Sequence, residues 1–406
     1  MKFRSIRIEA WKQFEHIDIK FHSSVTILTG ANGSGKTTIL NLLGRHFGWN
    51  RPEVATPTKT PSGGYKWLNW LRDKIGSDKN RKIGEIHYSE GFAELRVPTE
   101  NQAEYQIEFK GTTKIDGLNI PSHRAIYAYQ QVPHISTTKR SRKDAFQISK
   151  NSTQKRFQLG QVIQQHPNFH IKETLLSWAV GGAGNEFISP DPQLYGYYKD
   201  FETILRNVLP ESLGFKRIAI RSYEIVLETQ SGDFLIDAVS GGISAVIDLV
   251  WQIYTCSEDN EGDLVVLIDE VENHLHPSMQ RRILPDLVLA FPNIQFIVTT
   301  HSPLVVGSVK NSRVYALSYN PDKFVVSQEL DLINKSKTAS EILTDVLGVP
   351  ITMPIWAEIE MTRILSFNRN SLPPEEYIAK IRRDLITAGL GEYFPEAIIR
   401  ASKDWQ

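Results

Sequence analysis

The sequence has a single cysteine, no excess charge of either sign and no long hydrophobic run. Cys256 alone excludes an internal disulfide and a zinc site built from several cysteines. No stretch approaches the roughly 18 consecutive apolar residues that a membrane-spanning helix requires, and the first residues lack the apolar core of a secretory signal. Lysine plus arginine and aspartate plus glutamate each number 46, so a charged partner must be recognised by a local patch. We therefore expect a cytoplasmic protein that contacts no membrane.

The order of apolar runs indicates an α/β fold. The 406 residues are enough for two or three domains. Near the start, two alternating runs and then an apolar run over 25–28 predict an antiparallel pair of strands followed by a buried strand. In the last third, predicted strands over 264–268 and 294–299 alternate with predicted helices over 244–254 and 277–290. This alternation favours a mixed, largely parallel sheet.

A glycine-rich loop follows the first buried strand. Residues 30–37 read GANGSGKT, which fits G-x-x-x-x-G-K-[ST] at every fixed position. Glycines let the backbone wrap until its N–H groups point at a phosphate, and the helix that follows adds its positive end. Lys36 is expected to reach the β- and γ-phosphates of ATP, and the Thr37 hydroxyl to hold Mg²⁺. The residues expected to bind the nucleotide here are Gly30, Ala31, Asn32, Gly33, Ser34, Gly35, Lys36, Thr37 and Thr38.

Two acids end a second apolar strand in "LVVLIDEVENHLHP". Asp269 is placed to sit beside Mg²⁺, and Glu270 to act as the general base on the attacking water. The alternative is a buried strand capped by an acidic turn, which is a poor explanation beside the glycine loop. His274 and His276 match no strong metal-ligand spacing, so we interpret them as part of a structural loop.

Two further segments have the chemistry to meet a γ-phosphate. In "IQFIVTTHSP" a strand ends at His301, which predicts an imidazole at the carboxyl edge of the sheet, where phosphates bind in doubly wound folds. Ser240, Gly241 and Gly242 begin a predicted helix and would offer a hydroxyl and unobstructed N–H groups. On its own each is weak, because a histidine at a strand end is usually packed or solvated and Ser-Gly-Gly is a common turn.

Together these four motifs resemble the ABC-type ATPase superfamily, within it the branch of RecF, SMC and OLD proteins. The resemblance implies an ATPase head with Walker A over 30–38, Walker B over 264–270, the signature motif "VSGGIS" over 239–244, and His301 as the switch histidine. It also implies a Q-loop glutamine at a strand end, for which Gln130 and Gln131, after a predicted strand over 123–132, both qualify.

The same resemblance divides the chain. The ATPase head would comprise 1–48 and 215–335 together with strand 123–132, an inserted β-rich and helical region would occupy 49–214, and 336–406 would form a helical tail. Three features argue against a transporter subunit: "VENHLHP" stands where transporters have "DEPTSALD", the interval from Walker A to the signature is long, and no membrane segment is present. SMC arms are absent as well, since no heptad run occurs.

Compact ATPases of bacterial anti-phage systems, such as Septu and retron-associated operons, resemble the chain most closely. In those systems the ATPase works with a separate effector, often an HNH nuclease, and assembles into oligomers. In such heads the signature completes a neighbour's site, so the resemblance implies a homodimer or higher oligomer in which ATP bridges Lys36 of one copy and Ser240 of another. Two alternatives stay open: a stand-alone RecF-like repair or replication ATPase, and a scaffold in which ATP is structural.

One segment is locally basic. Within 136–156, seven basic residues stand against the single acid Asp144; they are Lys139, Arg140, Arg142, Lys143, Lys150, Lys155 and Arg156. We expect a mobile loop or short helix on the surface. Residues 139–156 would suit the backbone of a nucleic acid, although a solvated loop balanced by distant acids explains the composition equally well.

Overall fold

The computed structural model forms two compact units, Met1–Ile342 and Leu343–Gln406, each considered by itself. It describes residues 1–59, 63–68, 80–98, 102–124, 126–136, 138–158, 165–257, 263–347, 353–366 and 373–403. Within those ranges no helix is both long and apolar enough to cross a bilayer.

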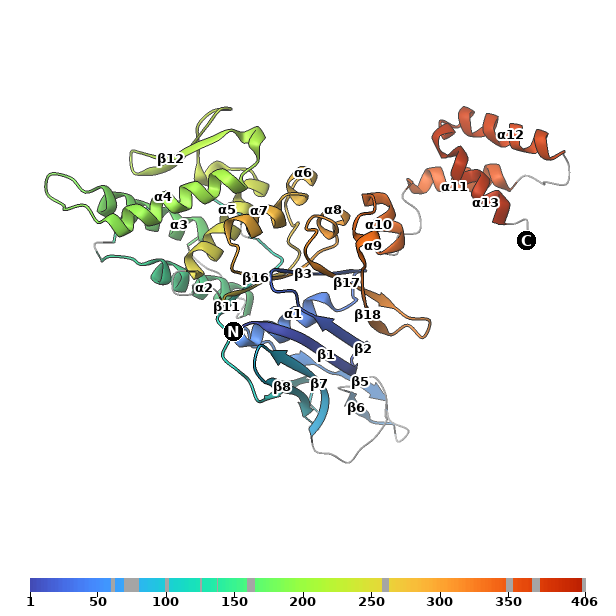
Figure 1. Cartoon of the computed structure of the whole chain (residues 1–406), viewed down its shortest axis with the longest axis horizontal. Coiled ribbons are helices and arrows are strands. Elements are labelled where there is room, and N and C mark those ends of the chain that lie inside the picture. Colours follow the sequence, from blue (N-terminus) through green and yellow to red (C-terminus); the bar gives the residue numbers. More distant parts are fainter. Residues whose placement is uncertain are drawn as a thin grey trace. The chain divides into compact units, whose positions relative to one another are not determined.

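An eleven-stranded mixed sheet runs through the larger unit, in the order β10-β8-β7-β1-β2-β18-β17-β3-β16-β15-β11 (Figure 1). Its strands are β1 (Phe3–Trp11), β2 (Phe14–Lys20), β3 (Val25–Gly30), β7 (Asn80–Tyr88), β8 (Phe92–Pro98), β10 (Glu108–Lys110), β11 (Gly117–Ile120), β15 (Val265–Ile268), β16 (Gln295–Thr299), β17 (Arg313–Tyr319) and β18 (Val325–Glu329). Neighbouring strands from β17 through β3, β16 and β15 to β11 are parallel. The predicted mixed α/β sheet is confirmed, and the carboxyl ends of these parallel strands meet at one edge.

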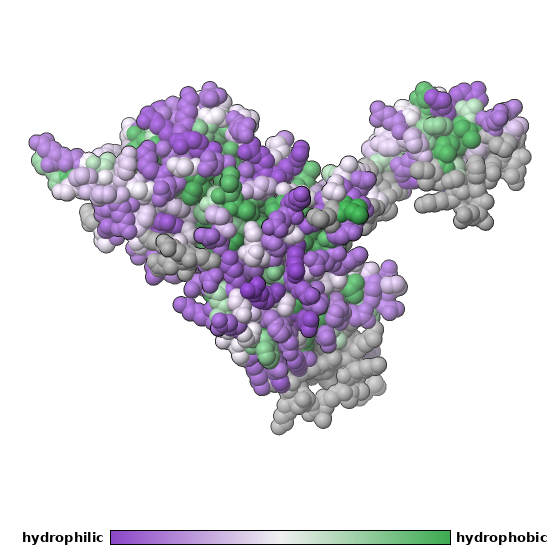
Figure 2. Space-filling view, viewed as in Figure 1, coloured by the Kyte–Doolittle hydropathy of each residue, from purple (hydrophilic) through white to green (hydrophobic). Residues whose placement is uncertain are grey.

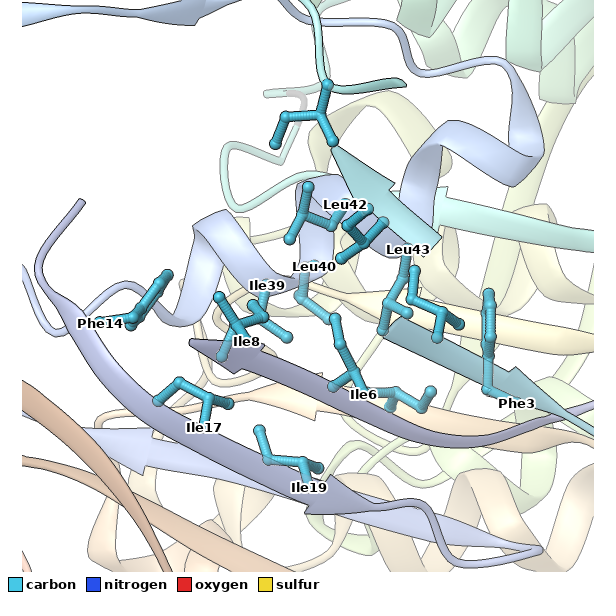
Figure 3. Close-up of a cluster of buried hydrophobic side chains, with 14 of the residues drawn as sticks. Phe3, Ile6, Ile8, Phe14, Ile17, Ile19, Ile39, Leu40, Leu42 and Leu43 are labelled. Carbon is cyan, nitrogen blue, oxygen red and sulfur yellow. The ribbon is translucent and has the colours of Figure 1, made fainter. Parts of the chain in front are cut away.

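Helix α1 (Lys36–Gly44) packs its apolar face on the sheet. Ile39, Leu40, Leu42 and Leu43 are buried against side chains of β1 and β2 (Figure 3). Ile6 and Ile8 of β1 stand two residues apart, as do Ile17 and Ile19 of β2, and residues at this spacing point to the same face. Phe3 and Phe14 complete the cluster. Each such buried side chain contributes roughly 1.5–3 kcal/mol, so the helix that follows the glycine loop is held firmly.

A helical layer contains α2 (Arg142–Gln158), α3 (Pro167–Ala183), α4 (Pro192–Val208) and α5 (Gly241–Cys256). Its centre is aromatic: the rings of Trp178 and Trp251 lie 5.4 Å apart, and Phe201 meets Trp251 edge-on at 5.0 Å. The expectation of a mobile loop or short helix over 136–156 is therefore wrong in part. The segment forms the long helix α2, because Trp251 and Tyr254 of α5 provide partners for its polar sequence.

The remaining helices and strands of the larger unit are short. They are β4 (Glu53–Val54), β5 (Thr56–Lys59), β6 (Tyr65–Leu68), β9 (Glu104–Tyr105), β12 (Phe215–Arg221), β13 (Glu224–Thr229), β14 (Phe234–Leu235), α6 (Pro277–Gln280), α7 (Ile283–Ala290), α8 (Pro303–Val306), α9 (Leu332–Lys335) and α10 (Ala339–Asp345), the last of which continues into the second unit. The single helix expected over 277–290 is two helices. Pro285 has no N–H to donate to Arg281, so a continuous helix would lose that bond.

The strand expected over 123–132 is also wrong. Residues 123–124 and 126–132 are in no strand, and β11 takes the place beside β15 instead. The first residue of β11 is Gly117. A larger residue would not fit there, because its Cβ atom would lie 2.5 Å from the Val265 carbonyl oxygen. Only four residues pair, so the periodic signal of this strand is faint in the sequence.

The smaller unit is helical, as predicted, and has its own core. Helices α11 (Ile355–Leu365), α12 (Pro374–Thr387) and α13 (Phe394–Lys403) bury a cluster that includes Met361, Leu385 and Ala397. Apolar residues also gather on a visible face of this unit (Figure 2). On α11 the exposed ones are Ile355, Trp356 and Ile359.

Candidate functional site

The glycine loop leaves the carboxyl end of β3 in a backbone shape that only glycine allows. Gly30 has φ +137°, and a Cβ atom there would lie 2.3 Å from the Leu317 carbonyl oxygen. Gly35 has φ +90°, and its Cβ would lie 2.4 Å from the Phe14 ring. Both conformations are strained for other residues, so the glycines of the motif are required by contacts as well as by φ.

Lys36 is held inside the loop. Its Nζ donates hydrogen bonds to the carbonyl oxygens of Gly30 at 2.9 Å and Ala31 at 3.0 Å. Burial lowers the pKa of Lys36 to about 8, against the opposing effect of Asp269 and other nearby acids. The Ser34 hydroxyl is buried without a hydrogen-bond partner among the described residues. A phosphate oxygen would satisfy both groups, so the loop fits the anion that its sequence predicts.

Thr37, Asp269 and Thr299 form one hydrogen-bonded group at the strand ends. The Thr37 hydroxyl donates to Asp269 at 3.0 Å, and the Thr299 hydroxyl donates to the same carboxylate at 2.6 Å. Burial raises the pKa of Asp269, while both threonine hydroxyls act to lower it. A hydroxyl and a carboxylate at this separation supply the oxygen ligands that Mg²⁺ prefers. These side chains therefore suit the metal site that the sequence predicts.

Glu270 adopts a left-handed backbone conformation with φ +45°. Its N–H donates to the Thr299 hydroxyl at 2.7 Å, and its carboxylate accepts a hydrogen bond from the Asn273 amide at 2.7 Å. The same amide donates to the Ser122 carbonyl oxygen at 3.0 Å. Such backbone conformations persist where surrounding contacts enforce them, and they are common at active sites.

His301 lies one residue beyond Thr300, which follows β16. Its N–H donates to a Glu272 carboxylate oxygen at 2.5 Å. Burial, followed by the charge of Lys36, lowers the pKa of His301, which favours the neutral imidazole. A neutral imidazole can donate from one ring nitrogen and accept at the other, which suits a group that contacts a phosphate oxygen.

Arg124 is a site residue that the sequence interpretation missed. Its side chain is buried, and it donates to the carbonyl oxygens of Asp269 at 3.1 Å, Glu270 at 3.4 Å and Pro121. Burial lowers its pKa to about 10, although surrounding acids oppose the shift. Thr299 and Asn273 were missed for the same reason, because their contacts join segments far apart in the sequence. Thr299 could have been found from the "TTH" sequence at the end of β16, because that strand end was already expected to face the phosphates.

The signature segment lies at the start of α5. Ser240 is the N-cap residue, is exposed, and makes no hydrogen bond from its side chain to the helix. A Cβ on Gly241 would meet nothing, whereas one on Gly242 would lie 3.0 Å from the His274 carbonyl oxygen. Among the described residues, no hydrogen bond links this segment to the glycine loop. The helix end is therefore open to a partner, and the role of Ser240 in a shared site stays a prediction.

Gln130 and Gln131 also stay predictions as the Q-loop residue. The Gln130 side chain accepts a hydrogen bond from the His166 N–H at 3.1 Å, and its carbonyl oxygen accepts one from Lys172 at 2.9 Å. Gln131 is exposed. Neither contact involves the glycine loop. A Q-loop glutamine is expected at a strand end, and Ser122 and Arg124 are closer in sequence to the end of β11 at Ile120 than either glutamine is.

Three basic side chains of the segment 139–156 make contacts within the fold. Arg140 pairs with Glu173 at 2.9 Å, and Lys139 pairs with Asp191 at 2.7 Å. Arg142 donates to the Tyr254 carbonyl oxygen at 2.9 Å. These three side chains hold α2 and the preceding residues in place. A nucleic-acid contact through 139–156 stays a prediction.

His276 has a structural role, because its Nδ1 accepts a hydrogen bond from Ser278 N at 3.3 Å and so caps α6. Within the described ranges, no cluster of three or more histidine, cysteine or acidic side chains could hold a metal. The interpretation of His274 and His276 as part of a structural loop agrees with this capping.

A glycine loop between a strand and a helix, with Walker B acids two strands away and a Ser-Gly-Gly helix start, defines a P-loop ATPase head of the ABC type. The chain belongs to the family described as "AAA domain, putative AbiEii toxin, Type IV TA system", whose model matches residues 25–307.

Three proteins illustrate what the chain is similar to. Septu protein PtuA of Bacillus thuringiensis is 23% identical over 87% of this chain and 86% of its own length. The "Retron Ec83 probable ATPase" of Escherichia coli is 35% identical, over 33% of this chain and 23% of its own length. A solved Smc head bound to the C-winged helix domain of ScpA is 16% identical, covers 82% of this chain and 98% of its own, and has a TM-score of 0.46.

Proposed function

We propose that this protein is an ATP-hydrolysing switch or scaffold subunit of a prokaryotic anti-phage complex. The observation that carries the proposal is the hydrogen-bonded group in which Thr37, Asp269, Thr299 and Glu270 meet at the mouth of the glycine loop. A scaffold that only stores ATP would not need a carboxylate oriented by an amide beside that group, as Glu270 is by Asn273. That arrangement favours turnover.

Each side chain has a distinct part in the proposed reaction. Thr37 and Asp269 would hold Mg²⁺, which supplies positive charge to the phosphoryl oxygens when bound. Lys36 leaves the carbonyl oxygens of its own loop and donates to the β- and γ-phosphates. Glu270 accepts a proton of the attacking water as the water oxygen bonds to the γ-phosphorus and the bond to the departing ADP oxygen breaks. His301 donates a hydrogen bond to the γ-phosphate. Hydrogen bonds already hold Thr37, Asp269 and Glu270 in place before the nucleotide binds, which lowers the cost of organising these three groups.

The open start of α5 supports a shared site. Its exposed N–H groups and the Ser240 hydroxyl would bind the γ-phosphate held by another copy, so ATP would join two heads and hydrolysis would release them. The similarity to Septu and retron proteins supports a place in anti-phage defence. We propose a separate effector protein, with an HNH-type nuclease as the first candidate.

Glu270→Gln tests the hydrolytic role. It keeps the size and the hydrogen bond from Asn273 but removes the base, so we expect ATP turnover to fall about 100-fold or more while an ATP-bound dimer accumulates. Phosphate release and mass by light scattering, with and without ATP, report the two effects. Glu186→Gln, an exposed carboxamide control, should match the wild type. Unchanged turnover in Glu270→Gln would remove Glu270 from the mechanism.

A mixing experiment tests the shared site. Lys36→Ala and Ser240→Arg each disable both sites of a homodimer, but a mixed dimer contains one site with both residues intact. We expect the mixture to regain up to a quarter or so of wild-type turnover by random pairing, a rough limit set by mass action. If the mixture is as inactive as each variant alone, the arrangement across two copies is wrong.

A further inference from the structure

A row of polar side chains runs along α5 from the signature into the last part of the helix. Ser240, Ser244, Asp248 and Gln252 recur every four residues and so share one face. Ser244, Asp248 and Gln252 are buried, and the Gln252 amide donates to Asp248 at 2.8 Å. Burying a polar group is costly unless it has a hydrogen-bonding or charged partner. This face of α5 therefore needs a polar partner from outside the helix.

Arg124 faces this row across a small cavity. The cavity, of about 10 Å³ and so with room for one water molecule, is lined by Arg124, Arg156, Asp248 and Gln252 among others. Asp248 is also the acid that most strongly raises the pKa of the Arg124 guanidinium, against the effect of burial. The Arg124 Nε is buried without a hydrogen-bond partner among the described residues. One guanidinium therefore lies between the signature helix and the loop after β15.

The other side of Arg124 contacts the backbone of the proposed base. One terminal nitrogen donates to the carbonyl oxygens of Asp269 at 3.1 Å and Glu270 at 3.4 Å. Glu270 has φ +45°, and its N–H is bonded to Thr299. Arg124 thus donates a hydrogen bond to the carbonyl oxygen of Glu270, and the Thr299 hydroxyl accepts one from the N–H of Glu270.

We propose that Arg124 is a positioning residue that couples the signature helix α5 to Glu270 within one head. A ligand anion at Ser240 would act on the end of a continuous helix, and Asp248 two turns further on would carry a displacement to the guanidinium. Through its hydrogen bond to the Glu270 carbonyl oxygen, the guanidinium would then place the Glu270 carboxylate in the position for proton transfer. Binding of one site's phosphate by α5 would in this way influence the base of the other site. The inference rests on the proposed function.

Three variants test the coupling. Arg124→Met removes the donors, Arg124→Lys keeps the charge but loses the planar fork, and Asp248→Asn keeps a hydrogen bond to Gln252 but removes the charge. We expect kcat to fall about 10–100-fold in Arg124→Met, a size typical of a misplaced catalytic group. KM and the ATP-dependent dimer should be retained. Arg124→Lys should be intermediate, and Asp248→Asn should lower kcat without changing KM.

Arg142→Met is the matched control, because its guanidinium also donates to a backbone carbonyl oxygen, but to that of Tyr254 near the end of α5, away from Glu270. It should lower Tm and leave kcat of the folded protein unchanged. The double variant of Arg124→Met and Asp248→Asn should be no slower than Arg124→Met, since Asp248 is proposed to act through Arg124.

Two outcomes would overturn the inference: wild-type kcat in Arg124→Met, or lost nucleotide binding that explains its whole defect. If Arg124→Met does not fold, Arg124→Lys and Asp248→Asn decide, and wild-type kcat in both contradicts the coupling. Failure of the proposed function looks different. In that case wild type and Glu270→Gln turn over ATP equally, whereas failure of the coupling alone leaves Glu270→Gln inactive and these variants active.

Discussion

At the scale of residues, the motifs predicted which side chains lie together better than how those side chains are held. The pairing of Thr37 with Asp269 follows from two motifs that both end parallel strands. Arg124 could not be found in this way, because its importance depends on a bond to backbone atoms of Asp269 and Glu270. Any sequence could supply those carbonyl groups, so no residue pattern marks the contact.

Lys36 should make the nucleotide-free protein less stable than a neutral residue would. Its pKa in the folded state is about 8, below the 10.4 or so of an unfolded chain. Below pH 8 both states are protonated and the full cost of burying the charge applies. Between about pH 8 and 10.4 the unfolded state binds more protons, so wild-type stability recovers as pH rises.

We therefore expect Lys36→Met to unfold at higher denaturant concentration than the wild type at pH 7, with a difference that shrinks toward pH 10. Urea midpoints at pH 7, 8, 9 and 10 without nucleotide measure it. Lys310→Met, at an exposed lysine, controls for the pH response of the rest of the chain. A difference that stays constant or grows with pH would contradict the buried-charge explanation.

At the scale of elements, hydrophobic periodicity predicted the strands that are continuous apolar runs. It missed the short strand β11 and the mostly polar helix α2. The parallel strands β3, β15 and β16 were recoverable because each is a continuous apolar run. β11 has four paired residues and was replaced in the prediction by a longer apolar stretch. Helix α2 has few apolar residues, and its contacts to α5 decide its structure.

Trp251 should be the residue on which the helical layer most depends. It is 1% exposed and contacts the rings of Trp178 and Phe201. Trp251→Ala would lose this burial and leave a cavity, at a cost of about 3–5 kcal/mol. We expect Tm to fall by roughly 6–15 °C, as measured by calorimetry. Phe187→Ala, at a side chain that is 89% exposed, should change Tm little, and equal shifts would show that the aromatic cluster is not central.

At the scale of the whole molecule, the chain separates into two units with separate cores. The core of the larger unit includes residues of α1 and the sheet, whereas the core of the smaller unit is formed by residues of α11, α12 and α13 with their connections. Every side chain in the proposed hydrolytic site comes from the larger unit. Helical periodicity predicted the character of the smaller unit, but no motif in it indicates what its exposed residues Ile355, Trp356 and Ile359 contact.

A chain that ends after residue 347 should fold and keep its catalytic site. We expect its Tm to lie within about 3 °C of the full-length value, since each unit has a core of its own. Turnover should persist, because Lys36, Asp269 and Glu270 are all retained. Calorimetry and phosphate release on the shortened and full-length chains measure both. A soluble, folded fragment without turnover would show that the smaller unit contributes to catalysis, and an aggregated fragment would show that the larger unit needs it to fold.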